Sequence, residues 1–141
     1  MPDKRDEQQR LQQAVEQMLV EAKTLGASAA EAVISSNRGL SATVRLGEPE
    51  TIEHTHDQGM GVSVYFGQRK GSASSTDLSP NAIRETVAKA CTIARHTSDD
   101  KYKGLADPEL LARDIPDLDL CHPWKLDVQD AIEQAVACED A

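Results

Sequence analysis

Gly59-Met-Gly-Val-Ser-Val-Tyr-Phe-Gly-Gln-Arg-Lys-Gly-Ser-Ala-Ser-Ser-Thr-Asp-Leu-Ser-Pro80 is the stretch of sequence that decides the fold. Residues 62–66 alternate between the two faces of a half-buried strand, with Val and Phe on one of them. Gly67–Gly71 then predicts a turn, and the small residues of Ser72–Thr76 predict a short strand. Ser79-Pro80 supplies the N-cap and first residue that are typical of a helix. The stretch therefore predicts two antiparallel strands followed by a helix.

Before this stretch the chain has the same period of two, which is typical of strands. The alternation covers three segments, at 30–35, 40–46 and 51–57. Asn37-Arg38-Gly39 predicts a tight turn between the first two, and Gly47-Glu48-Pro49 predicts a turn before the third. Gln58–Gly61 predicts a turn before the strand at 62–66. Because consecutive strands with short turns pair as antiparallel neighbours, the sequence predicts an antiparallel meander of about five strands.

Two long helices complete the predicted fold. The first runs from about Asp3 to Leu25 and ends before Gly26, and its apolar stripe is Leu11, Val15, Met18, Ala22 and Leu25. The second begins after Ser79 and ends near His96, and its stripe is Ile83, Val87, Ala90, Cys91 and Ala94. The predicted class is α+β, with both helices packed on one face of the sheet.

The last part of the chain predicts less regular structure. Asp107-Pro108 can start a short helix through Leu111, and Asp114–Lys125 contains two prolines that favour an irregular path. A partial helix begins at Asp127 as N-cap, and we expect the chain to stop inside it. The predicted organisation is an N-terminal α+β domain at 1–126 and, at 127–141, the start of a helix that leads to a further domain.

Composition excludes several classes of function. The chain has 141 residues, a formal net charge of −9 and 3% aromatic residues, which suit one small core and argue against direct nucleic-acid binding. Neither a signal peptide nor a membrane helix is expected, because no apolar stretch is long enough. The odd number of cysteines, 3, without Cys-x-x-Cys spacing predicts reduced thiols in the cytoplasm.

The weak metal candidates are His54 and His56, within the segment Glu53–Asp57. On a strand these imidazoles point to the same face, about 7 Å apart at Cα. Zinc needs further ligands, and His96 and His122 are distant in the sequence. The alternative interpretation is a polar strand near a sheet edge, so no catalytic or metal site is predicted in this chain.

Three other motifs have ordinary structural interpretations. Cys121-His122 could be a metal or nucleophile pair, but adjacent residues in an extended loop point in opposite directions. The cations of Gly67–Gly71 could hold an anion, or the segment could be a solvated hairpin tip without a Walker motif. The hydroxyls at 74–76 have no Gly-x-Ser-x-Gly elbow. No His-Glu dipeptide occurs, so the motif of a zinc peptidase is absent from the sequence.

Several long runs carry a family resemblance. They are Gly71–Pro80, Ile93–Ser98 and Pro116–Leu120, the last followed by His122-Pro123. With these runs the chain resembles the N-terminal third of PmbA/TldE proteins, the "modulator of DNA gyrase" half of the TldD/TldE metalloprotease. The resemblance implies that zinc and an His-Glu-x-x-x-His motif lie in a TldD-type partner, so no cofactor is expected in this chain.

The same resemblance implies a function. A PmbA/TldE-type subunit forms a heterodimer with a TldD-type subunit, and the complex is a cytoplasmic peptidase that acts on peptides or unfolded proteins, including microcin precursors and an antitoxin. No catalytic residue carries over to this chain, which is expected to be non-catalytic alone. Two alternatives remain open. One is a standalone protein-binding regulatory module that acts through its acidic surface, and the other is a metal enzyme that uses His54 and His56.

Overall fold

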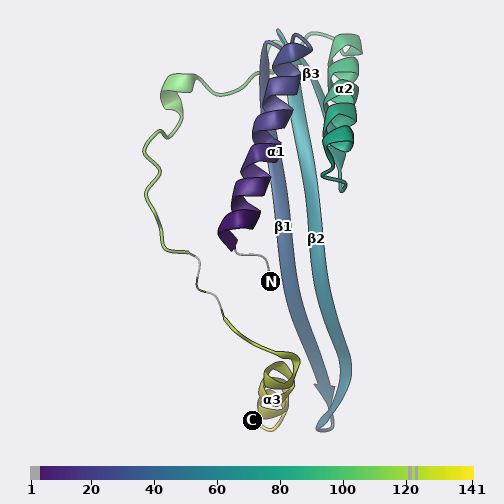
Figure 1. Cartoon of the computed structure of the whole chain (residues 1–141), viewed down its shortest axis with the longest axis vertical. Coiled ribbons are helices and arrows are strands. Elements are labelled where there is room, and N and C mark those ends of the chain that lie inside the picture. Colours follow the sequence, from purple (N-terminus) through teal and green to yellow (C-terminus); the bar gives the residue numbers. More distant parts are fainter. Residues whose placement is uncertain (1–3, 121, 123) are drawn as a thin grey trace. The chain divides into compact units, whose positions relative to one another are not determined.

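The computed structural model describes residues 4–120, 122 and 124–141. Along the chain it has seven elements: α1 (Lys4–Thr24), β1 (Ala29–Arg45), β2 (Glu48–Phe66), β3 (Arg69–Ser75), α2 (Pro80–His96), the 3-10 turn η1 (Pro108–Leu110) and α3 (Val128–Glu139) (Figure 1). The α+β class is confirmed. The described residues fall into two compact units, one from the segments before 37 and at 58–111, the other from 37–57 and 112–141.

The sheet has three strands in the order β1-β2-β3, so the prediction of five was wrong. Asn37-Arg38-Gly39 lies inside β1 and Gln58–Gly61 inside β2, where turns were expected. The turn between β1 and β2 is Leu46-Gly47, one residue before the turn expected at Gly47–Pro49, with φ of 54° and 76°. Two consecutive residues with positive φ make the type I′ turn whose twist matches a two-residue hairpin. Gly39 and Gly61 do not have positive φ, so the backbone there continues as strand.

The β2–β3 hairpin is also tighter than the sequence predicted. Phe66 pairs with Arg69, and the antiparallel register continues to Met60 opposite Ser75. The loop is therefore Gly67-Gln68, with Gly67 at a φ of 62°, rather than the five residues Gly67–Gly71. As a result β3 begins at Arg69 and the cations of the expected turn lie on a strand.

The capping residues explain where α1 and α2 begin and end. Gly26, with a φ of 87°, follows α1, and the amides of Gly26 and Ala27 bond the carbonyls of Lys23 and Ala22 in a Schellman motif. Ser79 is the N-cap of α2, since its hydroxyl accepts a bond from the Ala82 amide. The helix start expected at Asp3 lies outside the described residues.

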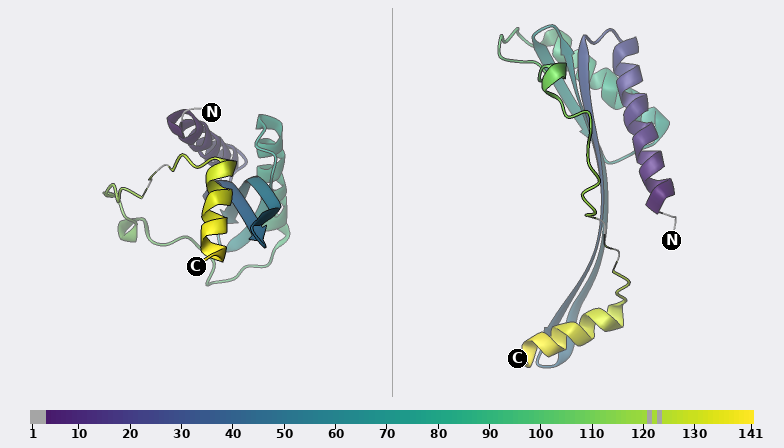
Figure 2. Two further views of the ribbon diagram at one scale, coloured as in Figure 1. Left: turned by 90° about the horizontal axis from the view of Figure 1, so that it is seen from below. Right: turned by 90° about the vertical axis from the view of Figure 1, so that its left-hand side faces the viewer.

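The core of the first unit lies between one face of the sheet and the two helices α1 and α2 (Figure 2). α1 contributes Met18 and Ala22, β2 contributes its alternate residues from Met60 to Val64, and α2 contributes the predicted stripe from Ile83 to Ala94. At Gly71 the backbone of α2 lies directly on β3, and a methyl group there would overlap the Ala90 carbonyl and the Ala94 amide. The helix residues of this core cluster all come from α1 and α2, which cover one face of this part of the sheet.

In the second unit α3 begins as the sequence predicted. Asp127 is the N-cap and makes a capping box with Asp130. The helix runs to Glu139, and the Asp140 amide still bonds the Val136 carbonyl. The expectation that this helix leads to a further domain stays a prediction. The boundary expected at residue 126 stays a prediction. Within the described part of the chain, no helix is both long and apolar enough to cross a membrane.

Candidate functional site

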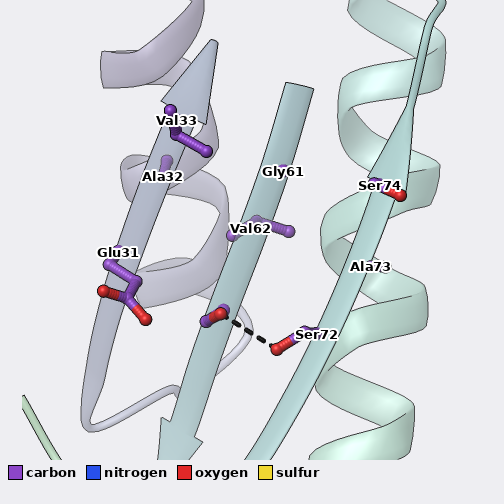
Figure 3. Close-up of a pocket in the computed structure, with 9 residues that line it drawn as sticks. Glu31, Ala32, Val33, Gly61, Val62, Ser72, Ala73 and Ser74 are labelled. Carbon is purple, nitrogen blue, oxygen red and sulfur yellow. Dashed lines mark hydrogen bonds between the residues drawn. The ribbon is translucent and has the colours of Figure 1, made fainter. Parts of the chain in front are cut away.

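A shallow hollow of about 400 Å³ lies on the sheet of the first unit (Figure 3). Its lining comes from three adjacent strand segments, namely residues 31–33, 61–63 and 72–74. Strand alternation sends Val62 and Ala73 toward the helices, so the side chains on the hollow's side are Glu31, Val33, Ser63, Ser72 and Ser74. The hollow therefore opens on the face of the sheet opposite α1 and α2.

Glycine creates this hollow. Gly61 lies on the central strand between Val33 and Ser74, and a Cβ at Gly61 would be 3.5 Å from Val33 Cγ1. A second hollow of about 560 Å³ shares Val33, Gly61 and Ser74 and extends the first toward Gly59. Because two alternate residues of β2 carry no side chain, the two hollows form a trough along that strand.

One end of the trough carries a polar cluster of Glu31, Tyr65 and Lys70. The Tyr65 hydroxyl donates to Glu31 Oε1 at 3.2 Å, and Lys70 Nζ lies 3.3 Å from the same oxygen. The Lys70 ammonium also lies 5.4 Å from the centre of the Tyr65 ring. Tyr65 is 4% exposed. Its hydroxyl thus has a partner, and the cluster is a fixed boundary of the trough.

The neighbours of Lys70 favour its charged form. The Tyr65 side chain and the Glu31 carboxylate raise the pKa of Lys70 above its ordinary value, although partial burial acts in the opposite direction. The serine hydroxyls along the trough are uncharged. Ser63 Oγ and Ser72 Oγ lie 2.9 Å apart, and either of them can donate the hydrogen bond. The trough therefore has one cation already paired with one anion, and hydroxyls that can donate to or accept from a ligand.

The structure places the weak metal candidates on an exposed strand. His54 and His56 are both exposed residues of β2, two apart and hence on one side of it. Among residues 4–120, 122 and 124–141, no group of three His, Cys, Asp or Glu side chains is arranged to hold a metal ion. The pair is not joined by a third ligand there, and the assignment of no metal site stays a prediction.

The other candidate motifs do not form sites in the described part of the structure. Arg69 Nη1 donates to the Arg95 carbonyl at 3.3 Å and Lys70 is paired with Glu31, so both cations of the suggested anion cradle have partners in the protein. Ser75 Oγ accepts a bond from the Asp77 amide at 3.1 Å, a local turn contact. Cys121 lies outside the described residues.

Sequence reasoning missed the trough and its polar end. It placed Arg69 and Lys70 in a turn, whereas both are strand residues, and it assigned Gly59 and Gly61 to a turn. The signal available in the sequence was glycine at alternate positions before an alternating apolar run, which can mark a strand with a close approach instead of a turn. Neither the trough nor the pair of Glu31 and Lys70 could be found without the register.

Comparisons with known proteins point to one family. Residues 30–94 match the family model described as PmbA/TldA metallopeptidase domain 1. The chain is 52% identical over 112 residues to Metalloprotease PmbA of Escherichia coli O157:H7, covering 79% of this chain and 25% of that protein. It is 45% identical over 135 residues to the Metalloprotease PmbA homolog of Haemophilus influenzae, covering 96% of this chain and 30% of that protein. The chain thus spans less than a third of the length of these relatives.

Two solved structures have the same fold as this chain. A putative modulator of DNA gyrase from Bacteroides thetaiotaomicron superimposes with a TM-score of 0.81 at 25% identity, over 92% of this chain and 30% of that one. TldE from Thermococcus kodakarensis shares the fold with a TM-score of 0.60 at 18% identity, over 79% of this chain and 25% of that one. With the family model and the identities to PmbA proteins, the chain belongs to the PmbA/TldE family and contains its first domain.

Proposed function

We propose that this chain is the first-domain part of a PmbA/TldE-type subunit, which works with a zinc-bearing TldD-type subunit as a cytoplasmic peptidase. In this proposal the chain supplies no catalytic group. It forms part of the wall of the chamber in which a peptide or an unfolded protein is held for cleavage. Microcin precursors and an antitoxin are the substrates that the family resemblance implies.

The observation that carries this proposal is the trough along β2. The trough runs along β2 where Gly59 and Gly61 carry no side chain, and it is lined by the serines at 63, 72 and 74. Hydroxyls can bond the backbone of any sequence, because they both donate and accept. Such a surface suits a peptidase of broad specificity, which must hold many sequences by their main chain.

The sheet also offers an edge. In the described sheet β3 pairs with β2 only, so its other side carries backbone groups that an added strand could bond. Peptide recognition by strand addition obtains its affinity from main-chain hydrogen bonds and is weakly dependent on sequence. The edge and the trough belong to the same three strands and support the same class of ligand.

The experiment uses the full-length protein that contains this chain, mixed with the TldD-type subunit from the same genome. Cleavage of an unstructured fluorogenic peptide is measured for each protein alone and for the mixture, with and without a chelator. The proposal predicts cleavage by the mixture only, and its loss when the chelator removes zinc. As a matched variant, Gly61→Val fills the trough, and Gly104→Ala, which has open space around it, is the control.

The outcomes separate the alternatives. Slower cleavage by Gly61→Val with an intact complex supports the chamber-wall role. Absence of both cleavage and complex formation by the wild-type proteins would contradict the proposal and favour a standalone binding module. The acidic composition, with a net charge of −9, is the feature on which that module would depend.

A further inference from the structure

The hairpin tip of the second unit exposes a leucine in an unfavourable backbone conformation. Leu46 has a φ of 54° and is 88% exposed. Left-handed backbone is disfavoured for a bulky side chain, and Asn or Asp before Gly is the usual choice in a type I′ turn. An exposed leucine also gains nothing from burial within the described structure. The residue at this position is therefore a poor choice for the turn itself.

A carboxylate from α3 holds this turn. The Glu139 carboxylate accepts two bonds from the turn, from the Leu46 amide at 2.7 Å and from the Gly47 amide at 2.8 Å. These bonds join residues 92 and 93 positions apart in the sequence. They fix the backbone from which the Leu46 side chain projects.

The charges around the tip are mostly negative. Arg45 forms an ion pair with Glu50 at 3.7 Å, and Glu139 bonds the turn. Glu48 follows the turn in the sequence and Asp140 follows Glu139, so this part of the chain has more carboxylates than cations. A protein surface that receives this tip would complement it best with an apolar pocket surrounded by Lys or Arg.

From these observations we propose that the tip is an anchor for the partner subunit, in which Leu46 inserts into an apolar pocket with a basic rim. Interfaces commonly depend on a few apolar anchors held in a fixed geometry, because a fixed anchor loses little freedom on binding. The Glu139 carboxylate supplies that fixation here. This inference rests on the proposed function, since it takes the TldD-type subunit as the partner.

The test uses the full-length protein that contains this chain and the purified TldD-type subunit. Leu46→Asn creates Asn-Gly, the sequence that a type I′ turn prefers, so the variant folds at least as stably as the wild type. Leu110→Asn is the matched control, because it makes the same change at a leucine of the first unit that is 82% exposed. The dissociation constant is measured by isothermal titration calorimetry, and Tm by calorimetry of each variant alone.

We expect Leu46→Asn to raise Kd by about tenfold or more, with Tm unchanged or higher, and Leu110→Asn to leave Kd unchanged. We also expect the wild-type affinity to fall as salt rises, because the rim contact is between charges. An unchanged Kd for Leu46→Asn overturns the inference, as does an equal loss in the control. A lower Tm for Leu46→Asn overturns it too, since Leu46 would then pack within its own chain.

A wild-type protein that forms no complex overturns both this inference and the proposed function. A wild-type complex that tolerates Leu46→Asn overturns the inference alone. The two failures are therefore distinguishable in one series of titrations.

Discussion

At Gly71 the backbones of α2 and β3 approach closely, and replacing this residue tests the packing of the first unit. The Cβ of an alanine at this position would overlap the Ala90 carbonyl oxygen and the Ala94 amide nitrogen, and would lie 2.9 Å from Ala94 Cα. All three atoms belong to the backbone, which cannot rotate away as a side chain can. Gly71→Ala therefore forces the helix to move off the strand.

The cost follows from what α2 buries. Ile83, Val87, Ala90, Cys91 and Ala94 are each at most 1% exposed and belong to the same core cluster as β2. Overpacking a well-packed core costs about 1–3 kcal/mol and occasionally more, and a clash with backbone belongs at the upper end. We expect Gly71→Ala to lower the free energy of unfolding by about 3 kcal/mol. For a domain of this size that corresponds to a fall in Tm of roughly 10–20 °C.

Urea denaturation followed by circular dichroism measures the effect, with Gly104→Ala as control. Nothing lies within 4 Å of a Cβ at Gly104, so that variant should stay within about 0.5 kcal/mol of the wild type. A Gly71→Ala variant as stable as the control would refute the close approach of α2 to β3.

Three further predictions concern the first unit and the thiols of both units. Met18→Ala removes a side chain that is 0% exposed and should lower the free energy of unfolding, measured by urea denaturation, by about 2–5 kcal/mol. Val20→Ala, at a position that is 65% exposed, should lower it little. Equal effects of the two substitutions would contradict the packing of α1. Burial raises the pKa of the Cys91 thiol, although Arg95 opposes this shift, whereas Cys138 is exposed. In a Cys121→Ser variant we expect a thiol reagent to label Cys138 at once and Cys91 only when the protein unfolds. Rapid labelling of both thiols in the native protein would be inconsistent with a buried Cys91. Because the pKa of Lys70 is raised in the folded state, its pair with Glu31 stabilises the protein fully below pH 10.5, and this stabilisation is lost as the pH rises further. The difference in Tm between the wild type and Lys70→Met should therefore shrink above that pH. A difference in Tm that grows above pH 10.5 would contradict this prediction.

The sequence predicted the helices well because their signals are local. Ser79-Pro80 and Gly26 act on the backbone next to them, and the apolar stripe of α2 has a period that only a helix satisfies. The N-cap at Asp127 was found for the same reason. These features depend on neighbours in the chain, which a sequence shows directly.

The strands were predicted less well because a turn depends on φ, which composition does not reveal. Asn37-Arg38-Gly39 has the residues of a turn but lies within β1, and Leu46-Gly47 makes the turn with a residue that disfavours it. The trough on β2 and the contact of Glu139 with the turn require the register and tertiary structure. They bring together residues far apart in the sequence, and no local pattern encodes that.

The most direct test of the proposed role is deletion of residues 1–97 from the full-length protein, followed by assembly with the TldD-type subunit. The measurement is peptide cleavage by the resulting mixture, together with the zinc content of the TldD-type subunit. We expect assembly and cleavage to be lost while the zinc content of the TldD-type subunit stays unchanged. Normal cleavage after the deletion would contradict it.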